Sequence, residues 1–249
     1  MSGHSHWATI KRKKSAVDAK RGKEFSKLTK AIMIAAKQGG GNPDMNLKLQ
    51  YAIEKAKQAN LPKDNIERAI KKATGELAGV NYDEIVYEGY GPGGVAIIIE
   101  VLTDNRNRTA PEMRKIFDKA GGNLGESGCV SWMFEKKGLI TVDHGCIDED
   151  DLMSMVLDVG AEDMERVGDT YQIICAPSDF ENVKKELIAK GVESKEAELS
   201  LIPSSFIKVN EKDGKRMIDL MDVIENHDDV QNVYANFNLS ESQLIEMQN

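Results

Sequence analysis

The sequence predicts an α+β protein in which an N-terminal three-helix domain precedes two ferredoxin-like α/β domains, one inserted in the other. Apolar residues recur at helical spacing up to about residue 75, and from Tyr82 the pattern becomes that of strands alternating with helices. The charge changes at the same place. Residues 1–75 hold 17 Lys and Arg against 6 Asp and Glu, a net charge of +11, whereas residues 76–249 hold 16 against 35, a net charge of −19.

This charge asymmetry predicts that a polyanion binds the basic end of the chain. Lys and Arg side chains near phosphates release condensed counterions, which supplies most of the non-specific affinity for nucleic acids. The acidic remainder repels the same polyanion, so contact is expected at one end only.

The first predicted domain, residues 1–78, opens with a polar arm that carries a basic run. The run is Lys11, Arg12, Lys13 and Lys14, and Trp7 precedes it. An exposed aromatic ring beside cations offers a stacking platform for bases. A solvated tail is the alternative interpretation of such a run.

A helix is expected over about residues 16–37, because apolar side chains recur on one face and cations on the opposite face. The apolar stripe consists of Phe25, Leu28, Ile32, Ala35 and Ala36. The opposite lysine row consists of Lys20, Lys23, Lys27, Lys30 and Lys37. One face is therefore expected to enter a core, and the other to present ammonium groups.

Two shorter amphipathic helices complete the predicted helical domain. Their inward residues are Leu49, Ala52, Ile53 and Ala56 in the first, and Ile66, Ala69, Ile70 and Ala73 in the second. Further cations, among them Arg68, Lys71 and Lys72, add positive charge to these helices. Because exposed lysine is common, an ordinary solvated face is the alternative for each of them.

The second predicted domain is discontinuous and comprises residues 79–136 and 205–240. Its expected elements are strands at 84–90, 95–102 and 129–135, a helix at 110–120, and a late helix at 218–226 followed by a strand at 230–236. Thr109 and Glu112 have the spacing of a capping box for the helix at 110–120. The strand at 95–102 is the most apolar and is expected to be central.

The third predicted domain, residues 137–204, is inserted between the two parts of the second. Its elements follow in the order βαββαβ, the ferredoxin-like arrangement: strand 139–142, helix 150–157, strands 161–166 and 171–175, helix 180–190 and strand 196–202. Short connections favour this division over one large sheet.

Several motifs resemble catalytic or ligand sites, but their context does not support one. Residues 89–94 match the glycine pattern of dinucleotide-binding loops, yet a strand follows them, so a hairpin turn is expected. The acidic run 148–151 lies where a helix begins, which complements the helix dipole. His4 and His6 lack neighbouring ligands for a metal. We therefore expect no enzymatic activity, cofactor, metal or small-molecule substrate.

Cysteine content and hydropathy indicate a cytoplasmic protein without a membrane span. Cys129, Cys146 and Cys175 are odd in number and widely spaced, which is typical of reduced thiols. The sequence has no apolar run of about 18 residues.

Arg106 and Arg108 lie between a strand end and a helix start, a position that suits either an anion or a salt-bridged loop. Both alternatives stay open. The candidate nucleic-acid-binding residues are Trp7, Lys11, Arg12, Lys13, Lys14, Lys20, Arg21, Lys23, Lys27, Lys30, Arg106 and Arg108.

Several ordered motifs resemble the YebC/PmpR family across essentially the whole chain. They lie at residues 2–8 (SGHSHWA), 18–23 (DAKRGK), 65–72 (NIERAIKK), 87–92 (YEGYGP), 102–109 (LTDNRNRT), 121–125 (GGNLG) and 130–134 (VSWMF). His6 departs from the family pattern, which usually has lysine there, and this removes one charge from the arm. The absence of a presequence resembles a bacterial-type member more than the mitochondrial translational activator of cytochrome oxidase.

The resemblance implies three domains and the family label of probable transcriptional regulatory protein, with duplex DNA as the partner. Other family members resemble ribosome-associated translation factors that ease synthesis of difficult stretches such as proline runs. The resemblance therefore implies duplex DNA or ribosomal RNA as the partner, with the ribosome as the assembly in which such RNA is bound. The basic N-terminal region agrees with either partner and does not distinguish them.

Overall fold

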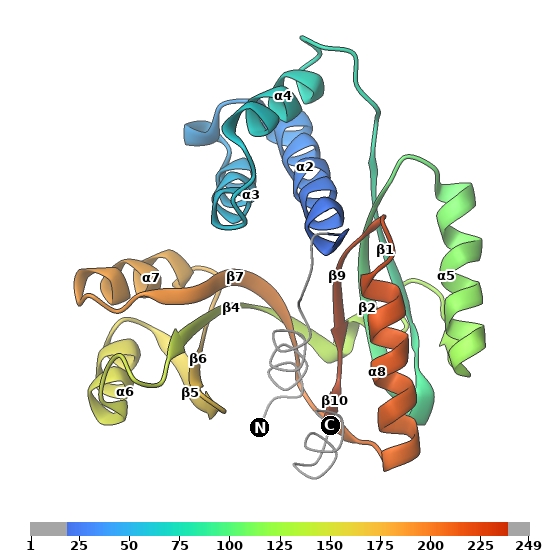
Figure 1. Cartoon of the computed structure of the whole chain (residues 1–249). Coiled ribbons are helices and arrows are strands. Elements are labelled where there is room, and N and C mark those ends of the chain that lie inside the picture. Colours follow the sequence, from blue (N-terminus) through green and yellow to red (C-terminus); the bar gives the residue numbers. More distant parts are fainter. Residues whose placement is uncertain (1–18, 239–249) are drawn as a thin grey trace. The chain divides into compact units, whose positions relative to one another are not determined.

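The computed structural model describes residues 19–238, with side chains from residue 21 onward, and these residues form two compact units. One unit contains residues 19–129 and Lys212–Val233, and the other contains Val130–Glu211 and residues 234–238. Figure 1 labels the elements in chain order. The expected fold class is confirmed, because a three-helix region is followed by two four-stranded sheets with helices.

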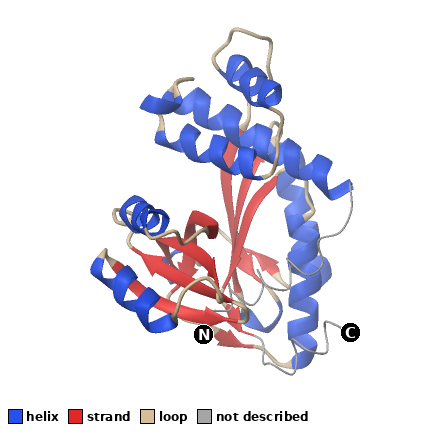
Figure 2. Ribbon diagram, turned by 60° about the vertical axis from the view of Figure 1, so that its left-hand side comes forward, coloured by secondary structure: helices blue, strands red, loops and turns tan. Residues whose placement is uncertain are grey.

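The helical region consists of α2 (Ala19–Gly39), α3 (Leu47–Gln58) and α4 (Lys63–Ala73), with α2 in contact with both others (Figures 1 and 2). Their apolar faces share one core, in which the predicted inward residues are buried or partly buried. The most buried members are Leu28, Ile32, Ala35, Ala36, Leu49, Ala56, Ile66 and Ala69. The predicted apolar stripe of the first helix is therefore confirmed.

Asn46 fixes the turn between α2 and α3. Its side chain is buried, and its Nδ2 atom donates to Ala35 O and Gly40 O, both at 2.8 Å. Its Oδ1 atom accepts from Leu49 N at 3.1 Å and so caps the start of α3. One side chain thereby satisfies main-chain groups at the end of one helix and the start of the next.

The first sheet has the strand order β3-β1-β2-β9 and includes a strand from late in the sequence. Its strands are β1 (Asp83–Tyr90), β2 (Ala96–Thr103), β3 (Asn123–Leu124) and β9 (Val230–Ala235). The β2 strand lies between β1 and β9 and is almost entirely buried, as predicted. The glycine motif at residues 89–94 lies in the connection between the antiparallel strands β1 and β2, with Gly93 at φ 74°, which confirms the predicted hairpin turn.

Two helices, α5 (Arg106–Ala120) and α8 (Glu211–Glu225), accompany this sheet. The capping box predicted at Thr109 and Glu112 is wrong, because α5 begins four residues earlier than expected. Its cap is Asn105, whose side chain accepts from Arg108 N at 3.1 Å. The late helix also begins earlier than expected, at Glu211 instead of Ile218.

The strand predicted at residues 129–135 is wrong. Residues Ser131–Met133 form a short 3-10 helix, in which Met133 N donates to Val130 O at 2.9 Å. The strand that follows, β4 (Phe134–Asp143), pairs with the second sheet, where Phe134 lies opposite Pro203. An apolar run alone does not distinguish a single helical turn from a strand.

The second sheet has the order β5-β6-β4-β7, with the elements in the predicted βαββαβ sequence. Its further elements are α6 (Glu149–Asp158), β5 (Ala161–Val167), β6 (Thr170–Cys175), α7 (Phe180–Ala189) and β7 (Ser194–Pro203). Asp148 caps α6 by accepting from Asp150 N at 3.0 Å, which confirms the helix-start interpretation of the acidic run. A small parallel pair, β8 (Ile207–Lys208) and β10 (Phe237–Asn238), completes the unit.

Candidate nucleic-acid interface

Three lysines of the predicted row on α2 form hydrogen bonds within their own compact unit. They donate to main-chain carbonyl oxygens at and just beyond the C-terminal end of α8: Lys23 Nζ to Asn226 O at 3.1 Å, Lys27 Nζ to Glu225 O at 2.6 Å, and Lys30 Nζ to Asp228 O at 3.0 Å. This part of the row therefore faces another segment of the chain.

The electrostatics of a helix end explain this arrangement. The last carbonyl groups of a helix lack intrahelical partners and carry partial negative charge, which cations stabilise. The last turn of α8 contains no basic residue of its own. Lysines from α2 supply the positive charge, although they are about 200 residues distant in the sequence.

Asp229, just after α8, is the centre of a buried polar cluster. Its Oδ1 atom accepts from Lys30 Nζ at 2.9 Å. Its Oδ2 atom accepts from Arg108 Nη2 at 2.8 Å, Thr109 Oγ1 at 2.9 Å and Thr103 Oγ1 at 3.1 Å. The cluster thus joins the helical region to both the end of β2 and the start of α5.

The ionised state of Asp229 is strongly favoured. Burial by itself raises the pKa of this carboxyl group, but hydrogen bonds from Lys30, Arg108 and Thr109 outweigh it and hold the pKa well below its ordinary value. Two cations and two hydroxyl groups therefore compensate one buried negative charge.

His227 extends the cluster to the surface of α5. Asp229 N donates to His227 Nδ1 at 3.2 Å, so the Nδ1 atom carries no proton. The Nε2 atom lies 3.0 Å from Glu112 Oε2 and is the donor in that contact. The two bonds together define one tautomer of the imidazole ring.

Arg106 and Arg108 lie in the first turn of α5, and both guanidinium groups are paired with carboxylates. Arg106 Nε bonds Asp83 Oδ2 at 2.9 Å. Arg108 Nη2 bonds Asp104 Oδ1 at 2.9 Å in addition to Asp229. The sequence left two alternatives for these arginines, an anion site and a salt-bridged loop, and the described contacts are those of a salt-bridged segment.

The remaining candidate residues lie at the start of the chain. The arm residues Trp7, Lys11, Arg12, Lys13 and Lys14 lie outside the described residues. The backbone of Lys20 belongs to the first turn of α2, and its side chain is likewise outside the description. Arg21 is exposed, and its guanidinium carbon lies 5.5 Å from the centre of the Phe25 ring.

An open groove beside the Asp229 cluster carries balanced charge. Its lining includes the cations Lys23, Lys30, Arg108 and Lys115 and the acids Asp104, Glu112, Asp228 and Asp229. Equal numbers of opposite charges give this groove no preference for a polyanion.

Sequence reasoning did not identify Asp229 as an important residue. It follows Asp228 at the end of a helix, where acidic residues are ordinary, and nothing local indicates burial. The signal that was available was the unusual density of lysine on α2, which requires acceptors if that face is covered.

Within residues 19–238, no group of three or more His, Cys, Asp or Glu side chains has the geometry of a metal site. None of the helices in that same range is long and apolar enough to cross a membrane.

The fold defines a class of α+β proteins with a helical N-terminal region and two further α/β regions. Family models match this chain as the TACO1/YebC N-terminal domain over residues 5–76 and the TACO1/YebC second and third domain over residues 82–237. The chain belongs to the TACO1/YebC family.

Relatives of similar length support the assignment. A protein of Natranaerobius thermophilus is 55% identical over 245 residues, which cover 97% of this chain and 98% of the relative. One of Pelotomaculum thermopropionicum is 54% identical over 243 residues, covering 97% and 100%. Both are named "Probable transcriptional regulatory protein". A crystal structure of a conserved hypothetical protein from Aquifex aeolicus is similar with a TM-score of 0.83 at 46% identity, covering 91% of this chain and 93% of that one.

Proposed function

We propose that this protein is a non-enzymatic, cytoplasmic regulator that binds DNA through its basic N-terminal region. The observation that carries the proposal is the charge segregation, with a net charge of +11 in residues 1–75 and −19 in the remainder. The name shared by the relatives, probable transcriptional regulatory protein, agrees with DNA as the partner. The acidic α/β regions repel phosphate and so orient the basic end towards it.

The domain boundaries at 1–78, 79–136 with 205–240, and 137–204 stay a prediction.

The proposed contacts are the arm residues Trp7 and Lys11 to Lys14, with Lys20 and Arg21 at the start of α2. Contact at Lys23, Lys27 or Lys30 requires phosphate oxygens to replace the carbonyl groups and carboxylates that these lysines now bind.

Lysine dominates the basic region, and lysine suits phosphate contacts more than base recognition. Base edges in the major groove are typically read by Arg, Asn and Gln from a helix inserted there. Phosphate contacts position a protein on nucleic acid without selecting a sequence. We therefore propose binding of low sequence specificity.

A second candidate function is that of a translation factor that binds ribosomal RNA on the ribosome. Trp7 beside the basic run favours it, because aromatic rings stack on unpaired bases, which structured RNA presents more often than duplex DNA. In that case the basic region binds RNA and the acidic regions face away from it.

A salt titration with an arm variant tests the proposal. The variant replaces Lys11, Arg12, Lys13 and Lys14 by alanine, and fluorescence anisotropy measures the affinity for labelled 20-base-pair DNA at several salt concentrations. Loss of four phosphate contacts makes the negative slope of log K against log salt shallower by up to about 3.6. The charge-matched control replaces the exposed residues Lys185, Lys190, Lys212 and Lys215. An unchanged affinity and slope in the arm variant would exclude the arm as the contact.

A further inference from the structure

Three cations of α4, namely Arg68, Lys71 and Lys72, differ from Lys23 and Lys30 of α2 in having no acidic partner among the described residues. Arg68, Lys71 and Lys72 are all exposed. Throughout the part of the chain that the structure describes, no carboxylate is paired with any of the three side chains, whereas Lys23 and Lys30 are each paired with an aspartate. The helical region therefore has one basic face that the protein itself occupies and another that it leaves to the solvent.

Helical spacing places these three cations together. Residues three and four positions apart are neighbours on a helix surface, and Arg68, Lys71 and Lys72 have that spacing. The opposite face of α4 is fixed in the core by Ile66 and Ala69, which are buried. The three cations consequently form one outward face on a helix whose orientation is held by packing.

The ends of α4 carry opposite charge. Asp64 lies in the first turn, Lys63 pairs with Glu67 at 3.6 Å, and the last turn contains Lys71 and Lys72. Cations in a last turn also complement the helix dipole. That effect accounts for their position along the helix, but it requires no concentration of three cations on one exposed face.

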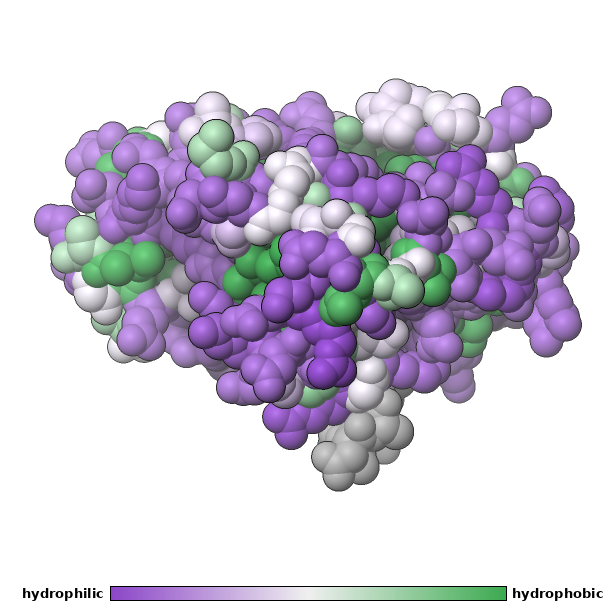
Figure 3. All heavy atoms as spheres, turned by 90° about the horizontal axis from the view of Figure 1, so that it is seen from above, coloured by the Kyte–Doolittle hydropathy of each residue, from purple (hydrophilic) through white to green (hydrophobic). Residues whose placement is uncertain are grey.

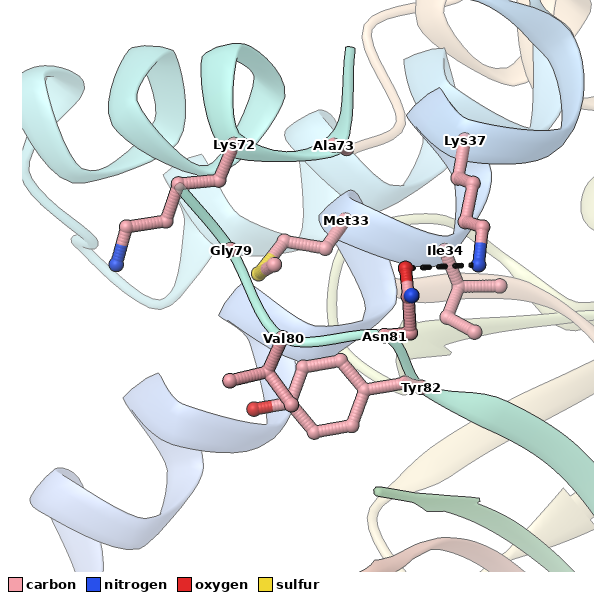
Figure 4. Close-up of a pocket in the computed structure, with 9 residues that line it drawn as sticks. All are labelled: Met33, Ile34, Lys37, Lys72, Ala73, Gly79, Val80, Asn81 and Tyr82. Carbon is pink, nitrogen blue, oxygen red and sulfur yellow. Dashed lines mark hydrogen bonds between the residues drawn. The ribbon is translucent and has the colours of Figure 1, made fainter. Parts of the chain in front are cut away.

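Figure 4 shows what lies beside this face. Lys72 borders a small cavity together with Lys37, Val80 and Tyr82, and the ammonium groups of Lys72 and Lys37 lie on opposite sides of it. Lys37 Nζ donates to Asn81 Oδ1 at 3.1 Å, whereas Lys72 extends away from the cavity. The cavity measures about 40 Å³, which is too small for a nucleobase. Any ligand of the lysines therefore lies on the surface and not in the cavity.

Among the described residues, the exposed large hydrophobic side chains near α4, Leu77 and Val80, follow the helix in the chain, and none lies on α4 itself. The face of the molecule seen in Figure 3 is mainly hydrophilic, with its hydrophobic residues in separate small patches. Protein interfaces instead concentrate apolar and aromatic residues at their centre. Exposed cations on a rigid helix suit phosphate groups.

We propose that the outer face of α4, formed by Arg68, Lys71 and Lys72, binds the phosphate backbone of nucleic acid, as a second contact separate from the N-terminal arm. This inference rests on the proposed function and specifies where within the basic region the polymer lies. In this arrangement Lys23, Lys27 and Lys30 of α2 keep their bonds to the carbonyl groups at and beyond the end of α8.

The test compares the full chain with a triple variant, Arg68→Gln, Lys71→Gln and Lys72→Gln, on labelled 20-base-pair DNA. Glutamine keeps the helix propensity of α4, and circular dichroism checks that the fold is unchanged. Three lost contacts make the negative slope of log K against log salt shallower by up to about 2.7, and the affinity at about 0.1 M salt falls at least about tenfold. The control variant, Lys185→Gln, Lys190→Gln and Lys212→Gln, changes the net charge equally and is expected to lose less than about threefold in affinity.

Each outcome decides a separate question. A shallower salt slope limited to the α4 variant supports the inference. Equal losses in the α4 and control variants, or an unchanged slope in the α4 variant while the unmodified protein binds, overturn the inference and leave the proposed function standing. If the unmodified protein does not bind this DNA, the proposed function fails and the inference fails with it.

Discussion

Replacement of Asp229 by asparagine is expected to destabilise the protein more than any exposed charge change. The side chains of Asp229 and Lys30 are only 5% and 12% exposed, so neither can regain water when the pair is broken. Asparagine keeps one oxygen acceptor, but it turns the other acceptor into an NH2 group that faces a cation. Arg108 still has Asp104, whereas Lys30 loses its only carboxylate among the described residues.

The expected loss is about 3–5 kcal/mol in the free energy of unfolding, the typical cost of leaving one member of a buried ion pair without its partner. Urea unfolding followed by circular dichroism at 222 nm measures it. Asp228→Asn is the matched control at the next position. Asp228 and Lys23 are 74% and 52% exposed, so their pair contributes at most about 1 kcal/mol.

A loss below about 1 kcal/mol for Asp229→Asn would refute this reasoning. It would mean that the cations at Asp229 are hydrated in solution and that the cluster does not join the helical region to the sheet. Equal effects of Asp228→Asn and Asp229→Asn would refute the distinction between the buried and the exposed pair.

Three further predictions concern pH, a helix cap and the thiols. In the folded protein the pKa of Asp229 lies below its ordinary value of 3.8, so the unfolded chain binds the proton first as the pH falls. The stabilisation that Asp229 provides is therefore fully present above about pH 5 and is lost as the pH falls through the pKa of the folded carboxyl group. Acid titrations of stability should therefore fall less steeply for Asp229→Asn than for the unmodified protein. Asn46→Ala removes three bonds to main-chain groups and should cost about 2–3 kcal/mol in urea unfolding; a loss near zero would show that water replaces the side chain. Cys146 is exposed, whereas burial raises the pKa of Cys175 to about 11, so iodoacetamide should alkylate Cys146 first by mass spectrometry, and equal rates would contradict the burial.

Regular elements with clear periodicity were predictable from the sequence. The stripe on α2 and the apolar β2 strand occur where expected, because burial of one face imposes a period that local composition reveals. Element ends were less predictable. The start of α5 depends on Asn105, which caps the helix. The spacing of Thr109 and Glu112 matches a capping box, but the Thr109 hydroxyl group donates to Asp229 instead.

The lysine row illustrates why the candidate site could not be predicted fully. Its helical spacing was correct, but a row of cations has the same pattern whether it faces phosphates or a helix end of the same chain. Only the three-dimensional fold brings Lys23, Lys27 and Lys30 to the carbonyl groups at the end of α8. The contacts of these lysines depend on a segment about 200 residues away, and no local signal encodes that partner.

The most direct test of the claim that this protein binds DNA is a competition between duplex DNA and ribosomes. The full-length protein is incubated at physiological salt with ribosomes and an excess of mixed-sequence duplex DNA, and the fraction bound to each is measured after sedimentation and on immobilised DNA. The account predicts retention on DNA with the ribosomes left free. Sedimentation with ribosomes despite the excess DNA would contradict it and would establish the translation factor as the better description.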